Sequence, residues 1–267
     1  MKFLNREEAP LSQEVWALID ETLMGLLAKR LRIRSVVDFD EGYDFTADAV
    51  PTGKVRSVPG VEGVKIGLRE PILMMEIRYD FSVPKSTLDA MKRDIEDFDD
   101  TPLRRAANAF GAAENGMILD GIDAAASPGL LGMLTQKTLK ASGAKELMVA
   151  AARSLGMFNN EFVDGPFKLL VSSATFAQLV VEAEGGETMK QKIDNIFGAD
   201  AIVVTDAIGD DKALVISQRG GDFIFYSGLD VHVGYDSESE EALNFFLIES
   251  GAFRVINPEA AVRIDLV

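Results

Sequence analysis

The stretch VISQRGGDFIFYSG, residues 215–228, places a Gly-Gly pair between two apolar runs, with Arg219 before the pair and Asp222 after it. A glycine-rich loop beside a cation can cradle a phosphate. It can equally turn a hairpin, because type I′ and II′ turns need positive φ angles that Gly adopts without steric strain. Strand-like residues flank both sides of the pair, so the pattern favours a hairpin turn over a phosphate site.

The common nucleotide-binding patterns are absent from the sequence. Neither G-x-G-x-x-G nor G-x-x-x-x-G-K-[ST] occurs. The segment GLLG, residues 129–132, has neither the required lysine nor a preceding strand. Nucleotide binding therefore has no support in the sequence.

An excess of acidic residues limits the partners that this chain can have. Its 267 residues include 43 Asp and Glu against 27 Lys and Arg, which gives a formal net charge of −16. Without a basic cluster, such a chain is unsuited to gripping nucleic acid or an anionic membrane, and we expect neither partner. The absence of cysteine excludes disulfides, thiolate nucleophiles and thiolate metal sites.

Nothing in the sequence predicts export or membrane insertion. Charges interrupt the N-terminal MKFLNREEAPLSQE before an apolar core can form, so it does not read as a signal peptide. The longest uncharged runs, residues 124–136 and 169–181, have 13 residues each, whereas a membrane-spanning helix needs about 20. We expect a soluble, cytoplasmic protein.

Apolar periodicity predicts an amphipathic helix over residues 12–31, with Pro10 and Ser12 marking its start. The face of this helix must bury against something, within this chain or outside it. Its apolar stripe repeats every four residues, at Val15, Ile19, Leu23, Leu27 and Leu31.

The rest of the chain mixes helices and strands. Residues 40–71 carry five Gly and three Pro among short strand-like runs, which predicts an extended arm rather than compact core. Thr101 is the predicted N-cap, and Pro102 the first residue, of a further helix. Because the elements do not alternate as regular βαβ units, the predicted fold class is α+β. Other predicted helices are 144–158, 174–183 and 187–197, with strands at 72–83 and throughout the segment after residue 201.

Candidate catalytic and metal-binding residues are few. A Ser-His-Asp site would have to use His232, the only histidine, but no G-x-S-x-G elbow accompanies it, and a structural or solvent-facing histidine is favoured. The acidic run at residues 94–102 lacks the spacing and central Gly of an EF-hand loop. A solvated run that precedes a helix N-terminus is the better interpretation. No catalytic residue, metal site or cofactor is predicted.

A series of short motifs runs in order nearly from end to end of the chain. These segments are FLNREEAPLSQEVWALID (3–20), GLREP (67–71), EIRYDF (76–81), TPLRRAA (101–107), ENGMILDG (114–121), GLLG (129–132), GPFKLLVS (165–172), ISQRGGDF (216–223), GLDVHVGY (228–235) and FRVINPEA (253–260). No single motif is decisive, but in their order and spacing they resemble the encapsulins, the shell proteins of bacterial and archaeal nanocompartments.

The resemblance implies the fold of the Hong Kong 97-type phage capsid protein. In that fold a peripheral P-domain with a long spine helix carries an extended E-loop and an axial A-domain. The implied division of this chain is an N-terminal helix and P-domain start at 1–39, an E-loop at 40–71, a P-domain segment at 72–129, an A-domain at 130–225 and P-domain strands at 226–267.

The implied function is structural. The resemblance predicts a homo-oligomeric icosahedral shell of about sixty copies, with a triangulation number of one, that encloses a cargo enzyme. The implied cargo is a ferritin-like protein or a dye-decolourising peroxidase, which connects the shell with iron storage or oxidative stress. A phage major capsid protein and a bacteriocin- or peptidase-type protein remain the alternatives.

The resemblance also implies two functional surfaces. A groove between the N-terminal helix and P-domain strands would bind a C-terminal targeting peptide of the cargo, through apolar pockets and a rim of charge. A loop at the five-fold pore would favour cations. The groove residues carried over by position are Leu23, Leu27, Leu31, Arg34, Asp38, Leu229, Asp230, Val231, Val233 and Gly234, and the pore residues are Glu182, Glu184, Gly185, Gly186 and Glu187.

One departure from the family pattern concerns a cofactor. Some encapsulins stack a flavin on a tryptophan in the segment after FSV. Here that place reads PKST, residues 84–87, and the only tryptophan is Trp16. We therefore expect no flavin site.

Overall fold

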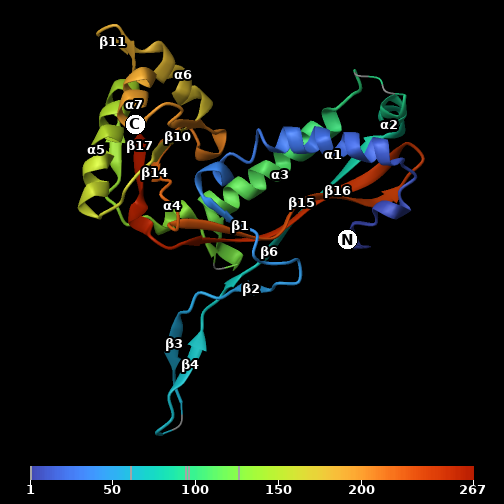
Figure 1. The fold of residues 1–267 in the computed structure, drawn as a ribbon, viewed down its shortest axis with the longest axis horizontal. Helices are drawn as coiled ribbons and strands as arrows, with labels where there is room; N and C mark the ends of the chain where they lie inside the picture. Colours follow the sequence, from blue (N-terminus) through green and yellow to red (C-terminus); the bar gives the residue numbers. More distant parts are fainter. Residues whose placement is uncertain (1, 61, 94, 96, 126) are drawn as a thin grey trace.

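The structure is a computed structural model that describes residues 2–60, 62–93, 95, 97–125 and 127–267. Its described strands form two principal sheets in two lobes, from which a long arm projects (Figure 1). One sheet has four strands in the order β1-β15-β16-β6, and the other has five in the order β13-β10-β14-β17-β9. The mixture of helices and sheets confirms the predicted α+β class.

The four-stranded sheet is built on two long antiparallel strands. β15 (Phe223–Glu238) pairs with β16 (Ala242–Val255), and β16 pairs along ten residues with β6 (Met75–Pro84). The short β1 (Asp38–Asp40) runs parallel to the start of β15. Register shifts interrupt the β15–β16 ladder, one of them between Leu229 and His232, and such bulges redirect the side chains that follow.

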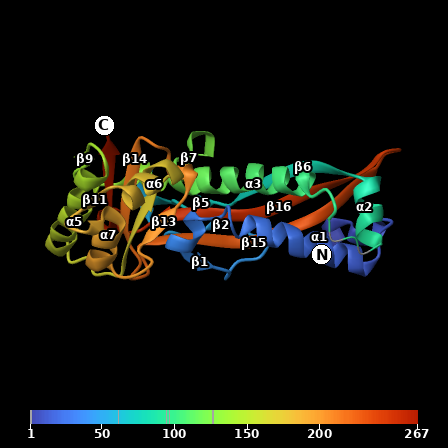
Figure 2. The same ribbon diagram turned by 90° about the horizontal axis from the view of Figure 1, so that it is seen from above.

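Two helices cover one face of this sheet. α1 (Gln13–Leu27) and α3 (Thr101–Leu119) run side by side along it (Figure 2). The apolar stripe predicted from the four-residue period is buried here, together with side chains of β6, β15 and β16. The short helix α2 (Lys85–Lys92) closes the end of the sheet remote from the other lobe (Figure 1).

α1 ends four residues before the sequence prediction. After Leu27 the chain tightens into i→i+3 hydrogen bonds and leaves the helical path. Asn115 of α3 holds this turn: its Nδ2 donates to the Arg30 carbonyl at 2.7 Å, and its Oδ1 accepts from the Ile33 amide at 3.2 Å. Leu31 therefore lies beyond the helix.

At the start of α3, Asp100 occupies the N-cap position and Thr101 is the first helical residue, so the predicted N-cap was wrong by one residue.

The second lobe surrounds the five-stranded sheet, whose strands are largely buried. Helices α5, α6 and α7 enclose it (Figure 1). Its strands are β9 (Leu139–Ala141), β10 (Phe167–Val171), β13 (Ile202–Val204), β14 (Lys212–Ser217) and β17 (Ala261–Leu266), and its helices are α4 (Leu130–Met133), α5 (Ala144–Asn160), α6 (Ser173–Val181) and α7 (Met189–Phe197).

Short elements complete the chain. β2 (Ala49–Val50) and β5 (Ile72–Leu73) pair at the base of the arm, and β3 (Val55–Val58) and β4 (Ile66–Arg69) form its hairpin. The others are β7 (Gly121–Ile122), β8 (Ser127–Pro128), β11 (Ala183–Glu184), β12 (Glu187–Thr188) and the 3₁₀ turns Lys2–Leu4, Arg6–Glu8, Ile33–Val36, Asp123–Ala125, Asp206–Ile208 and Pro258–Ala260.

The C-terminal strand corrects the expected domain division. The segment 226–267 was assigned to the P-domain throughout, yet β17 lies in the five-stranded sheet between β14 and β9. The reason is burial, because Ala261, Val262 and Ile264 are fully enclosed in the core of that lobe. The chain therefore returns to the second lobe after β16.

The Gly-Gly segment is not a hairpin, and that prediction was wrong. β14 and β15 flank it but belong to different sheets and do not pair, so the segment links the two lobes. Its glycines are nevertheless required, since Gly220 and Gly221 have φ angles of 89° and 82°. Beside them, the Gly221 amide donates to Asp38 Oδ2 at 2.5 Å, which ties the link to β1.

Arg219 and Asp222 fix this link from within. The buried Asp222 carboxylate accepts from Arg219 Nε at 2.9 Å and Nη2 at 3.0 Å, and from Asn257 Nδ2 at 2.6 Å. The Asp222 carbonyl also accepts from the Ile256 amide at 2.8 Å. One carboxylate thus holds together the beginning of β15 and the chain that leaves β16.

We predict that Asp222→Ala lowers the free energy of unfolding by about 2–3 kcal/mol, because it leaves Arg219 and Asn257 without their buried acceptor. Chemical denaturation followed by fluorescence measures the change. Asp211→Ala is the matched control, since Asp211 is exposed and its one ion pair among the described residues is with its neighbour Lys212. Equal transitions for the two variants would contradict the assigned role of Asp222.

Candidate assembly and cargo-binding surfaces

The leucines predicted for the cargo groove lie mostly inside the protein. Leu23 and Leu27 are 0% and 1% exposed, in the core that α1 shares with α3 and the four-stranded sheet. They present no surface to a peptide while α1 stays in place. Leu31 is half-buried just beyond the helix and is the member of this trio with accessible atoms.

The predicted strand wall of the groove is divided between two faces of the sheet. Val231 and Val233 face the core under α1. Leu229 packs on the opposite face, in a small cluster with Phe246. The register shift between Leu229 and His232 separates them, because a shift by one residue turns the side chains that follow to the other face.

Gly234 has a packing role that the structure makes clear. It pairs with Phe246 across the β15–β16 ladder, and an added Cβ would lie 2.1 Å from the Phe246 ring. The glycine therefore provides room for an aromatic side chain on the sheet.

Arg34 is the centre of a cluster of charged residues. It comes from the 3₁₀ turn after α1, and its guanidinium meets Glu114 of α3, Glu249 of β16 and Asp230 of β15. Nε lies 3.2 Å from Glu114 Oε1, Nη1 lies 2.6 Å from Asp230 Oδ1, and Nη2 bonds both Glu114 and Glu249. The Phe39 ring covers the guanidinium at 4.5 Å. Four elements thus converge on one side chain.

Two of these partners were missed by the sequence prediction, which placed an Arg/Asp pair on an accessible rim. Glu114 and Glu249 are fully buried. A single charge inside the apolar run NFFLIESGAF, around Glu249, was the available signal, because isolated charges in strand cores need partners. The predicted residue Asp38 does not join Arg34 but accepts from the Gly221 amide.

The arm carries apolar side chains that its own chain leaves exposed. Val55 on β3 and Ile66 and Leu68 on β4 are 62%, 44% and 49% exposed. The hairpin extends away from both lobes (Figure 1). The projecting part is shorter than the predicted arm of residues 40–71, because Val50 is buried in a cluster with Tyr43 and Tyr226 against the four-stranded sheet. A two-stranded hairpin is marginally stable alone, so this arm needs a covering surface.

The predicted pore loop is a hairpin at the tip of the second lobe (Figure 1). Gly185 and Gly186 join β11 to β12 with φ angles of 67° and 87°, as a two-residue turn requires. Glu184 is held by Lys145 at 2.7 Å and Lys192 at 3.1 Å, and these hydrogen bonds lower its pKa.

Charge at this tip is therefore partly compensated. Glu187 Oε1 accepts from the Asn195 side chain at 3.4 Å, and the exposed Glu182 offers its carbonyl to the Met189 amide. Of the three predicted pore carboxylates, Glu182 and Glu187 keep charges that no lysine or arginine of the described chain pairs.

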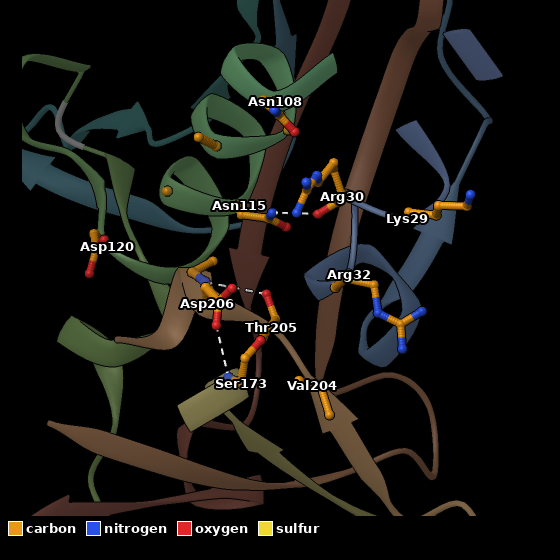
Figure 3. A pocket seen from close by; sticks show the side chains of 14 residues that line it. Lys29, Arg30, Arg32, Asn108, Asn115, Asp120, Ser173, Val204, Thr205 and Asp206 are labelled. Carbon is orange, nitrogen blue, oxygen red and sulfur yellow. Dashed lines mark hydrogen bonds between the residues drawn. The ribbon is translucent and has the colours of Figure 1, made fainter. Parts of the chain in front are cut away.

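A cleft of about 680 Å³ between the two lobes was not predicted. It lies between the end of α1, α3 and the start of α6 (Figure 3). Lys29 and Arg32 line it, but Figure 3 shows both side chains directed away from Asn115 and Asp206. Asp206 is engaged by the Ser173 amide at 2.8 Å. The charges are not focused on a common point.

The catalytic and metal-binding candidates of the sequence, His232 and the acidic run, do not belong to a catalytic cluster within the described residues. His232 is half-buried on β15, and its Nδ1 lies 2.7 Å from the Asp230 carbonyl. Searching those residues finds no cluster of His, Cys, Asp and Glu suited to a metal ion. Residues 94 and 96 of the acidic run lie outside the described residues, while Asp99 Oδ1 accepts from the Thr101 amide at 3.0 Å beside the start of α3.

No helix within the described ranges is long and apolar enough to cross a membrane.

Solved structures share the overall fold of this chain. A virus-like particle protein from Pyrococcus furiosus superposes with a TM-score of 0.61 at 18% identity, covering 91% of this chain and 98% of that one. The capsid protein of Myoviridae phage XM1 gives a TM-score of 0.55 at 10% identity, covering 88% and 91%. These likenesses show the Hong Kong 97-type capsid fold.

Sequence comparison identifies the family. The family described as encapsulating protein for peroxidase matches residues 1–252. Type 1 encapsulin shell proteins of Brevibacterium linens and Rhodospirillum rubrum are each 30% identical, over 100% of both chains in the first case and 99% of this chain and 96% of the relative in the second. The chain therefore belongs to the encapsulin shell proteins, a family with the structural role of forming a capsid-like compartment.

Proposed function

We propose that this chain assembles into a closed icosahedral shell of about sixty copies, with a triangulation number of one, that encloses an enzyme in the cytoplasm. The observation that carries the proposal is the arm with exposed apolar side chains in this chain, which aligns with an encapsulin over its full length. An arm that its own chain cannot cover is what a subunit needs in order to grip a neighbour. Repeating one such contact by symmetry closes a shell.

Charge on the arm supports its use between copies. Residues 53–69 contain Lys54, Arg56, Lys65 and Arg69 against one acid, Glu62, for a local charge of +3. The remainder of the chain then carries −19, since the total is −16. The positive arm is therefore attracted to the negatively charged remainder of a second copy. The negatively charged parts of two copies repel each other.

We predict that Leu68→Asp strongly reduces shell formation, because it places a charge in the apolar contact of every subunit. The lost apolar burial lowers the association constant of each contact by about tenfold, and this loss is repeated at every equivalent contact of the shell. Size-exclusion chromatography with light scattering measures the shell fraction.

Glu62→Gln is the control on the same arm, because it leaves the apolar surface intact. Normal shells from Leu68→Asp would show that the arm is not the assembly contact. A soluble Leu68→Asp subunit with native circular dichroism would confirm that the substitution affects assembly rather than folding.

The proposed cargo site is the rim where the end of α1, the following turn and β15 meet. Leu31 provides accessible apolar surface, Asp230 provides charge beside Arg34, and Asp38 provides a second carboxylate where β1 meets the Gly220–Gly221 link. A peptide bound along this rim would make an apolar contact and ionic contacts that fix its position. Short linear peptides are recognised by this combination. The cargo we propose is a ferritin-like protein or a dye-decolourising peroxidase, with a C-terminal targeting peptide and a role in iron storage or oxidative stress.

We predict that Leu31→Asp reduces capture of a reporter protein carrying the targeting peptide by about tenfold, because it removes burial worth about 1.5 kcal/mol. Co-purification with assembled shells measures it. Met24→Asp is the control, since Met24 is an exposed apolar residue on α1 seven positions earlier. Undiminished capture by Leu31→Asp would exclude Leu31 from the site.

The loop from Glu182 to Glu187 is the proposed pore constriction. Its two carboxylates without a lysine partner would give the opening a preference for cations, while the Gly-Gly turn keeps side chains out of the narrowest point. Glu184 would act structurally, by tying the hairpin to α5 and α7 through its two lysines.

A further inference from the structure

Glu114 and Glu249 form a pair of fully buried carboxylates inside the subunit. They project from α3 and β16 toward the same nitrogen, Arg34 Nη2. Glu249 Oε2 is buried and has no hydrogen-bond partner among the described residues. A buried ionised oxygen without a partner is costly, whereas a protonated one donates to a neighbour.

The charges around Arg34 do not balance if every group is ionised. One guanidinium would face Glu114, Glu249 and Asp230, which leaves a net charge of −2 at a largely buried site. Two carboxylates that touch one nitrogen also repel each other. A single proton shared by Glu114 and Glu249 reduces the buried charge to one carboxylate opposite one guanidinium.

We propose that the Glu114–Glu249 pair holds one proton at neutral pH, and that this proton fastens the segment after α1 to the P-domain. Residues 28–37 are anchored by Arg34 and by the contacts of Asn115 with Arg30 and Ile33. Removing the proton leaves three carboxylates around Arg34 and weakens that anchor. The segment of residues 28–37 therefore loosens as the pH rises.

The direction of the pH dependence follows from burial. Desolvation, followed by the charge of Glu114, raises the pKa of Glu249 well above the ordinary value of 4.5. A group whose pKa is higher in the folded state contributes stability that is fully present below its unfolded pKa. That contribution is lost as the pH rises through the folded pKa, so the weakening appears on the alkaline side.

The elements packed against the pair contribute further groups. β15 contributes Asp230 and the 3₁₀ turn contributes Arg34, while β6 places the apolar Ile77 beside Glu249. β1 contributes the Phe39 ring. His232 lies two residues after Asp230, and its Nδ1 contacts the Asp230 carbonyl, so it needs its own control.

The experiment compares assembled wild-type protein with Glu249→Gln and Glu114→Gln at matched pH. We expect the wild-type Tm to fall by about 3 °C between about pH 6 and about pH 9, and the fall to be absent in either variant. Hydrogen exchange in residues 28–37, compared between proteins at one pH, should show the same pattern. An infrared carbonyl band of a protonated carboxyl at neutral pH should disappear in Glu249→Gln.

Three further proteins make the result decisive. His232→Asn should keep the wild-type pH dependence, and so should Glu161→Gln, a change at an exposed acid. The double variant Glu114→Gln/Glu249→Gln should be less stable than either single variant, because Arg34 then keeps only the accessible Asp230. A wild-type slope retained in both single variants, or a slope removed by His232→Asn, would overturn the proposal. If Glu249→Gln fails to fold, Glu114→Gln carries the same test.

Discussion

The apolar arm of residues 51–71 cannot be buried by the chain that carries it, and the organisation of the molecule follows from that constraint. Both lobes have cores of their own, so neither needs the arm for stability. Val55, Ile66 and Leu68 stay exposed along a hairpin that points away from the lobes. In the proposed shell, a neighbouring subunit would cover these side chains.

Inside the subunit, two ionic clusters each secure a connecting segment of the chain. Asp222 accepts hydrogen bonds from Arg219 and Asn257 where the chain passes between the sheets. Arg34 forms ion pairs with carboxylates from three elements, just beyond the end of the N-terminal helix. Both clusters fix a position through a buried charge, and removing one partner is destabilising because it leaves the other charge buried without compensation. The unpartnered oxygen of Glu249 makes the second cluster sensitive to protons.

Local patterns predicted the local structure well. The four-residue period of α1, the Gly and Pro content of the arm and the Gly-Gly turn at 185–186 each specify a backbone conformation by short-range physics. The end-to-end motif series gave the family and its fold. Strand pairing was less accessible: the Gly-Gly of residues 220–221 has the φ angles of a turn, but tertiary burial sends its two strands into different sheets.

The groove residues show the limit of transferring positions without coordinates. Leu23 and Leu27 have the same sequence spacing whether they face a peptide or a core, and the core holds them. Leu229 and Val231 are two residues apart, yet a bulge places them on opposite faces. Glu114 and Glu249 lie far apart in sequence, so their convergence on Arg34 becomes visible only in three dimensions.

The mass of the purified wild-type chain in solution tests the central claim most directly. Light scattering after size exclusion should give one closed particle of about sixty subunits, seen as uniform hollow spheres by electron microscopy. A stable monomer of 29.0 kDa that keeps its arm exposed at high concentration would contradict the account.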